Sequence, residues 1–202
     1  MDYWHDLLTE KSWKVLRELK GKFPFILIGG WAVYLLARTQ KSRDIDIIVD
    51  LQTLAAIKKG YDVIKNDNLK KYEIKREEID IDMYVPYYSR LCIPLERVEA
   101  EITGGYSVAK LEYLLALKQG AELGRGKSVK GEKDRIDIVS MLFNCTIDLK
   151  MYAQLCKEHQ LESFISRLKS LVQNFKDFNA LRVTPRELKI KKEHVLHKLR
   201  AI

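Results

Sequence analysis

Cysteine and proline are scarce in this chain of 202 residues, which contains three cysteines and four prolines. The cysteines form no C-x-x-C pair, and an odd number cannot all pair with one another. This pattern argues against a disulfide framework and against a cysteine zinc site. Reduced thiols are typical of a reducing compartment, so we expect a cytoplasmic protein. No compositional bias indicates a disordered or fibrous chain.

Long hydrophobic runs are missing as well. The longest nearly apolar stretch, residues 23–37, contains Pro24 and two glycines and is too short to cross a bilayer as a helix. The N-terminus shows no basic segment followed by an apolar one, so we expect neither a signal peptide nor membrane association. Hydrophobic residues make up 47% of the chain, which is enough for a buried core. The formal net charge of +8 weakly favours polyanionic partners such as nucleic acids and nucleotides.

The apolar pattern predicts an α+β fold in two parts. An amphipathic helix is expected over roughly the first twenty residues, followed by alternating short strands and helices. From Ser107 onward the pattern is helical, with Ser107 as the N-cap of a helix and a basic loop at 124–133. The glycine pair at 104–105 is therefore the expected boundary between a core of residues 1–105 and a helical lobe of residues 106–202.

Two aspartates stand near the start of the predicted strand RDIDIIVD. Asp44 and Asp46 share one face because side chains alternate along a strand, and the intervening apolar residues form the core face. A second predicted strand repeats this pattern with Asp80 and Asp82. Clustered carboxylates repel one another unless a cation lies between them, and oxygen ligands favour Mg²⁺. If the strands are neighbours, a carboxylate of the second joins the first pair in a site that can hold two metal ions.

A glycine pair supplies the other half of the predicted site. Gly29 and Gly30 lie between a predicted strand at 23–28 and a predicted helix at 31–38. A bare backbone at a helix N-terminus offers N–H donors to an anion. Phosphates at the glycines, with a metal ion at the aspartates, describe nucleotidyl transfer.

The order and spacing of three segments resemble the nucleotidyltransferase fold of the DNA polymerase beta superfamily, over about residues 24–86: Gly29-Gly30-Trp31, Arg43-Asp44-Ile45-Asp46 and Asp82. The resemblance implies a mixed sheet flanked by helices, Mg²⁺ and the triphosphate at Asp44 and Asp46, and a third carboxylate that binds a second Mg²⁺ and helps to deprotonate the acceptor. We prefer Asp82 to Asp80 as the third carboxylate because Asp82 precedes the Tyr-Val-Pro stretch at residues 84–86, as the corresponding aspartate does in the family. Many members have serine where this chain has Gly30, so phosphate contact here must use the backbone.

Segments further along resemble small prokaryotic nucleotidyltransferases of the AbiEii toxin type: residues 84–89, Leu117-Lys118 and residues 130–137. This likeness implies that Lys118 and Lys133 contact the nucleotide phosphates, with Asp134 and Asp137 orienting them. Arg43 either binds a phosphate or neutralises the aspartates beside it.

The expected activity is metal-dependent transfer of a nucleoside monophosphate from an NTP to an acceptor, with release of pyrophosphate. The acceptor stays open among tRNA, a protein and a small molecule, as in aminoglycoside nucleotidyltransferases. CCA-adding enzymes share the glycine and aspartate spacing, but this chain is short for that task. The alternatives are a non-catalytic nucleotide- or RNA-binding protein that retains the fold, and one half of a toxin–antitoxin pair. The sequence sets neither the base preference nor the oligomeric state.

Overall fold

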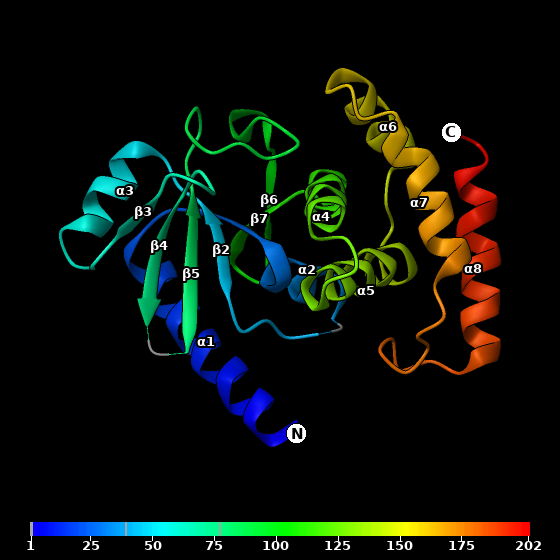
Figure 1. The fold of residues 1–202 in the computed structure, drawn as a ribbon, viewed down its shortest axis with the longest axis horizontal. Helices are drawn as coiled ribbons and strands as arrows, with labels where there is room; N and C mark the ends of the chain where they lie inside the picture. The colour runs from blue at the N-terminus through cyan, green and yellow to red at the C-terminus, as the bar shows by residue number, and fades with distance from the viewer. Residues whose placement is uncertain (1, 39, 77) are drawn as a thin grey trace. The chain divides into compact units, whose positions relative to one another are not determined.

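The computed structural model describes residues 2–38, 40–76 and 78–202, with side chains from Asp6 onward, and divides the chain into two compact units (Figure 1). The first unit, Met1–Lys110, holds a seven-stranded mixed sheet with helices, and the second, Leu111–Ile202, is helical in its described elements. The α+β class expected from the sequence is confirmed. None of the helices in the described ranges combines the length and apolar character that crossing a membrane requires.

The first unit alternates short strands and helices after one long helix. Its elements are α1 (Asp2–Lys22), β1 (Ile26–Ile28), α2 (Gly29–Ala37), β2 (Ile45–Ile48), α3 (Leu51–Lys58), β3 (Ile64–Asn66), β4 (Lys71–Arg76), β5 (Ile79–Tyr84), the 3-10 helix η1 (Leu95–Arg97), β6 (Ala100–Thr103) and β7 (Tyr106–Ala109). The strand order in the sheet is β3-β4-β5-β2-β1-β7-β6. The pairs β2–β5 and β1–β7 are parallel, and the other neighbours are antiparallel.

Strand β7 corrects the sequence prediction for the segment around Ser107. The expected helix N-cap at Ser107 is wrong, because this residue lies in β7 opposite Ile102 of β6. Gly104 and Gly105 have φ values of +57° and +78°, the left-handed backbone that a tight hairpin needs. The hairpin adds residues 106–109 to the sheet, helix α4 begins at Leu111, and the two compact units divide after Lys110.

An aromatic cluster fixes helix α2 against α1. The Trp31 side chain is buried, and its indole Nε1 donates a 2.8 Å hydrogen bond to Ser12 Oγ. The ring of Trp13 lies 5.0 Å from that of Trp31, centroid to centroid. Ile45 and Ile47 of β2 are also buried, as expected for the core face of that strand. These contacts hold the glycine pair that begins α2 in a defined position.

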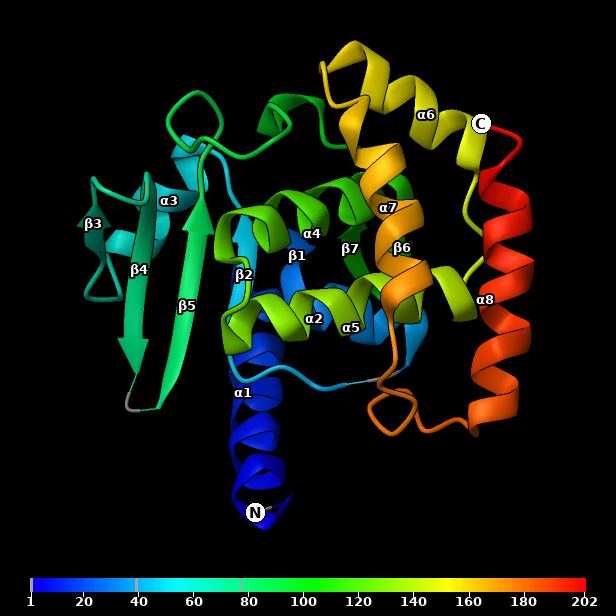
Figure 2. The same cartoon turned by 45° about the vertical axis from the view of Figure 1, so that its right-hand side comes forward.

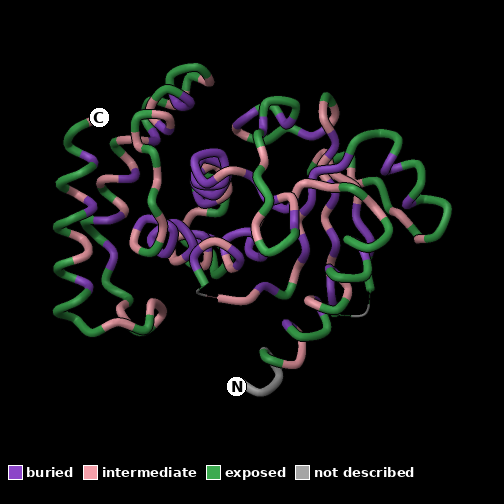
Figure 3. Tube along the Cα trace, turned by 180° about the vertical axis from the view of Figure 1, so that it is seen from behind, coloured by how far each residue is buried: buried purple, intermediate pink, exposed green. Residues whose placement is uncertain are grey.

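The second unit consists, in its described residues, of five helices: α4 (Leu111–Arg125), α5 (Val129–Asn144), α6 (Leu149–Glu158), α7 (Ser163–Asn174) and α8 (Pro185–Leu199). Figure 3 shows the large share of buried residues in α4, where every position from 111 to 119 is buried. Helices α7 and α8 lie side by side (Figure 2). The predicted basic loop at 124–133 is wrong in its second half. The Ser128 side chain accepts a hydrogen bond from Gly131 N and caps α5, so Lys133 is on a helix.

Candidate active site

Parallel strands β2 and β5 bring two of the predicted carboxylates face to face. Asp46 lies opposite Asp82 in the register of the two strands, so both side chains lie on the same face of the sheet. Asp44 immediately precedes β2, and its charge acts on Asp82. The competing residue Asp80 instead lies opposite Lys75 of β4. Within the described residues, no group of three or more His, Cys, Asp or Glu side chains is arranged to hold a metal ion.

Gly29 lets the Asp46 carboxylate lie directly against the backbone at the start of α2. Its φ is +68°, and a Cβ placed on Gly29 would lie 2.1 Å from Asp46 Oδ2. The register of β1 and β2 explains this closeness, because Ile28 lies opposite Asp46 and Gly29 is the next residue. Gly30 follows inside the helix and is buried. The predicted glycine pair and the predicted aspartate therefore form one feature at a helix N-terminus.

We expect Gly29→Ala to lower the free energy of unfolding by about 1–3 kcal/mol, because alanine at this position has a strained φ and its Cβ overlaps Asp46. Urea denaturation measures the change. Gly60→Ala is the matched control, since nothing lies within 4 Å of a Cβ at Gly60, and we expect a change below about 0.5 kcal/mol. Wild-type stability of Gly29→Ala would contradict the close approach of Gly29 and Asp46.

Arg43 contacts the carboxylate next to it in the chain. Its Nε donates a 3.1 Å hydrogen bond to Asp44 Oδ1. The side chains are 47% and 27% exposed, so this pair contributes little to stability. This contact favours the second of the two roles that the sequence leaves open for Arg43, neutralising the neighbouring aspartate, and phosphate binding by Arg43 stays a prediction.

A cation that the sequence analysis did not single out lies against Asp82. Lys71, the first residue of β4, places its Nζ 2.6 Å from Asp82 Oδ2 and 3.0 Å from Glu73 Oε1. The three side chains are only 12%, 16% and 11% exposed, in the order Lys71, Asp82, Glu73. Asn66 of β3 also donates a 3.0 Å hydrogen bond to Glu73 Oε1. The available signal was the alternation of Lys71, Glu73 and Lys75 along one face of the strand KYEIKR.

Burial and ion pairing act in opposite directions on the pKa values of these groups. Burial disfavours the charged form of Lys71, but the hydrogen bonds that it donates to Asp82 and Glu73 outweigh burial and raise its pKa. Burial also raises the pKa of Asp82, and Lys71 opposes that rise only in part. Burial by itself would raise the pKa of Glu73, but the hydrogen bonds from Lys71 and Asn66 lower this pKa below its ordinary value. Lys71 is therefore a fixed positive charge at neutral pH.

The predicted phosphate-binding lysines belong to the second unit. The Lys118 residue is 7% exposed, and its Nζ lies 3.1 Å from Asp134 Oδ1 and 2.6 Å from Asp137 Oδ2. Arg125 NH1 binds the other oxygen of Asp134 at 2.7 Å. The expected contact between these aspartates and Lys118 is thus present. Lys133 lies on α5 and is partly exposed.

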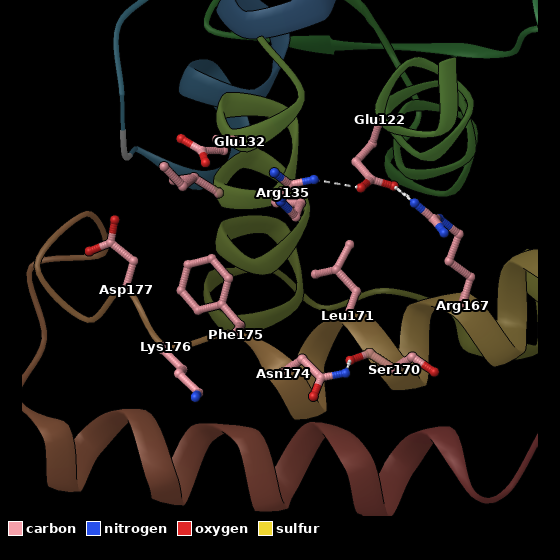
Figure 4. A pocket seen from close by; sticks show the side chains of 11 residues that line it. Glu122, Glu132, Arg135, Arg167, Ser170, Leu171, Asn174, Phe175, Lys176 and Asp177 are labelled. Atoms are coloured by element: carbon pink, nitrogen blue, oxygen red, sulfur yellow. Dashed lines mark hydrogen bonds and ion pairs between the residues drawn. The ribbon is translucent and has the colours of Figure 1, made fainter. Parts of the chain in front are cut away.

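A pocket of about 590 Å³ lies within the second unit (Figure 4). On its polar side, Glu122 is 2% exposed and accepts hydrogen bonds of 2.9 Å from Arg135 NH1 and from Arg167 Nε. Figure 4 shows Leu171 and Phe175 on the apolar side. Both arginines are bound to the same buried carboxylate, which makes this network a brace between α4, α5 and α7. None of the described residues that line the pocket is a predicted site residue.

No protein-family model and no curated protein matches this chain. Among solved structures, a candidate nucleotidyltransferase from H. pylori is similar at 19% identity over 96% of each chain, with a TM-score of 0.51. JHP933 from Helicobacter pylori aligns at 19% identity over 98% of this chain and 92% of its own, with a TM-score of 0.46. An antigenic nucleotidyltransferase-like protein from Paracoccidioides brasiliensis aligns at 18% identity over 81% and 93%, with a TM-score of 0.42. The first comparison shows that the chain has a nucleotidyltransferase-like fold.

Proposed function

We propose that this protein is a metal-dependent nucleotidyltransferase that moves a nucleoside monophosphate from an NTP to an acceptor and releases pyrophosphate. One observation carries the proposal. Asp46 and Asp82 lie in register on parallel strands, with Asp46 beside Gly29 at the N-terminus of α2, in a nucleotidyltransferase-like fold. In this proposal the carboxylates bind a metal ion, and the neighbouring backbone N–H groups bind phosphates.

Asp44 and Asp46 are the proposed ligands of Mg²⁺, because their carboxylate oxygens are the hard donors that this ion prefers. They fit the ion. Asp44 is partly exposed, at 27% of its side chain, and Asp46 lies beside a glycine where any Cβ would overlap it. When bound, Mg²⁺ would supply positive charge to the triphosphate and its leaving group.

Other residues bind phosphates and move the proton in this proposal. The backbone N–H groups of Gly29 and Gly30 hold the phosphate chain. Asp82 is the third carboxylate and accepts the proton of the acceptor hydroxyl. Its raised pKa favours that role, because a base works best with a pKa closer to the operating pH. In the second unit, Lys118 and Lys133 are the proposed phosphate contacts, and Lys118 is bound to Asp134 and Asp137 in the structure.

The acceptor is proposed to be an RNA such as tRNA, a protein, or a small molecule, and the formal charge of +8 favours RNA among these. A toxin–antitoxin role, suggested by the likeness of the sequence to AbiEii-type proteins, and a location in the cytoplasm belong to the same proposal. A second candidate function is a non-catalytic nucleotide- or RNA-binding protein. The ion pair of Lys71 with Asp82 favours that candidate, because it neutralises a carboxylate that catalysis uses.

The test is to incubate the purified protein with Mg²⁺ and each α-labelled NTP in turn, together with total tRNA, a protein extract or a small-molecule extract. Label on one acceptor pool supports transfer and identifies both the base and the acceptor class. Binding of NTP without label on any pool supports the non-catalytic candidate. Absence of both binding and transfer contradicts the proposed function.

A further inference from the structure

Lys71 is positioned by the strand register to lie between two carboxylates. Glu73 and Asp82 lie opposite each other in the antiparallel β4–β5 ladder, and Lys71 lies on the same face of β4, two residues before Glu73. Its Nζ is 2.6 Å from Asp82 Oδ2 and 3.0 Å from Glu73 Oε1. Asn66 holds Glu73 from the neighbouring strand. The ammonium is thus fixed by residues from three strands.

We infer that Lys71 serves as a built-in cation at Asp82, and that the site consequently binds one divalent metal ion, at Asp44 and Asp46, instead of two. The inference rests on the proposed function, which supplies the metal at the aspartates. Asp82 Oδ2 is within hydrogen-bonding distance of the Lys71 ammonium. A divalent ion bound to Asp82 would therefore be repelled by a positive charge at close range. The side chains around Lys71 leave it 12% exposed, so moving it aside would separate buried charges.

The charges of this face of the sheet support a single metal ion. Among the described residues, the carboxylates around the proposed site are Asp44, Asp46, Glu73 and Asp82, and the cations in contact with them are Arg43 and Lys71. The two cations neutralise two of the four carboxylates, and one divalent ion balances the remaining two negative charges. Lys75 and Asp80 also lie opposite each other on β4 and β5, and their formal charges add up to zero. A second divalent ion would leave the face with two excess positive charges, and loss of the Lys71 charge would reduce that excess to one.

The experiment counts Mn²⁺ ions bound to the full-length protein by the loss of the free-ion electron paramagnetic resonance signal, with Mn²⁺ as the only ligand. We expect one ion per wild-type chain. We expect two ions in Lys71→Gln, which removes the positive charge while keeping hydrogen-bond donors near Glu73 and Asp82. Two ions about 3.5–4 Å apart would also couple magnetically, a signature independent of activity.

Three variants serve as controls. Lys75→Met removes an exposed lysine from the same strand and should leave one bound ion. Lys71→Arg keeps the positive charge and should also leave one. Asp46→Asn should lose the single ion or weaken its binding at least about tenfold, because it removes a proposed ligand.

Every other ion count contradicts either the role of Lys71 or the proposed metal site. Two ions in the wild type would overturn the role of Lys71 and leave the proposed nucleotidyltransferase standing. A single bound ion in a folded Lys71→Gln variant would also overturn the proposed role of Lys71. If Lys71→Gln fails to fold, the wild-type count and Lys71→Arg still decide, since two ions in either contradict the inference. No Mn²⁺ bound to the wild type would overturn the metal site of the proposed function together with this inference.

Discussion

Asp46→Asn is expected to lower the rate of nucleotidyl transfer at least about 100-fold while leaving the fold unchanged. Asparagine keeps the shape of the side chain beside Gly29 but removes the charge that holds a divalent ion. Its position opposite Asp82 on parallel strands makes Asp46 central to the proposed site. The measurement is the initial rate of label transfer from an α-labelled NTP, with a thermal unfolding curve for each variant.

Asp80→Asn is the matched control for this substitution. Asp80 is on the same strand as Asp82 but lies opposite Lys75 rather than a predicted carboxylate. We expect its rate to stay within a few-fold of the wild type, since a substitution outside the site removes no ligand. Near-normal transfer by Asp46→Asn would contradict the assigned metal site. Loss of transfer in Asp80→Asn but not in Asp82→Asn would show that Asp80 is the third carboxylate.

Lys118→Met is expected to lower the free energy of unfolding of the second unit by about 3–5 kcal/mol. The substitution leaves Asp134 and Asp137, whose side chains are 2% and 1% exposed, without the ammonium that binds both. Arg125 still binds Asp134, whereas Asp137 loses the only ion pair that the described contacts give it. Methionine fills about the same volume as the buried aliphatic part of lysine. The decrease in the free energy of unfolding therefore reports the removal of the positive charge.

The measurement is urea denaturation followed by the helical circular dichroism signal. The three tryptophans, Trp4, Trp13 and Trp31, are all in the first unit, whereas helices make up the described elements of the second, so the helical signal is the one to follow. Lys157→Met on α6 is the control, because Lys157 is exposed, and a change below about 0.5 kcal/mol is expected there. Unchanged stability of Lys118→Met combined with weaker NTP binding would contradict the structural role and favour a phosphate contact.

The sequence carries a strong signal for the centre of the sheet. The alternation of polar and apolar residues along RDIDIIVD predicts that Asp46 and its neighbours Ile45 and Ile47 lie on opposite faces of the strand. In β2, Ile45 and Ile47 are buried and Asp46 is partly exposed. A strand with one polar face can be predicted from local sequence alone, because the extended backbone points successive side chains to opposite faces. The fold class follows from the order of such segments and is confirmed by the structure.

Features that depend on pairing between distant strands were not predictable in the same way. Lys71 looks like an ordinary surface lysine until β4 is placed beside β5, which brings its ammonium to Asp82. Strand β7 was missed because the helical pattern of α4 follows it almost directly, and only pairing with β1 and β6 makes residues 106–109 extended. Pairing energy is a tertiary effect that overrides the local pattern. The start of α5 was missed for a local reason, since the N-cap signal of Ser128 lies among glycines and lysines.

The central claim is that the protein transfers a nucleoside monophosphate, and the most direct test follows the two ends of one NTP. The protein is incubated with Mg²⁺ and acceptor, in parallel with α-labelled and γ-labelled forms of the same nucleotide. We expect the α-label to join the acceptor while the γ-label leaves as pyrophosphate in equal amount. A γ-label on the acceptor, or its release as inorganic phosphate with the α-label left on a nucleoside diphosphate, would contradict nucleotidyl transfer.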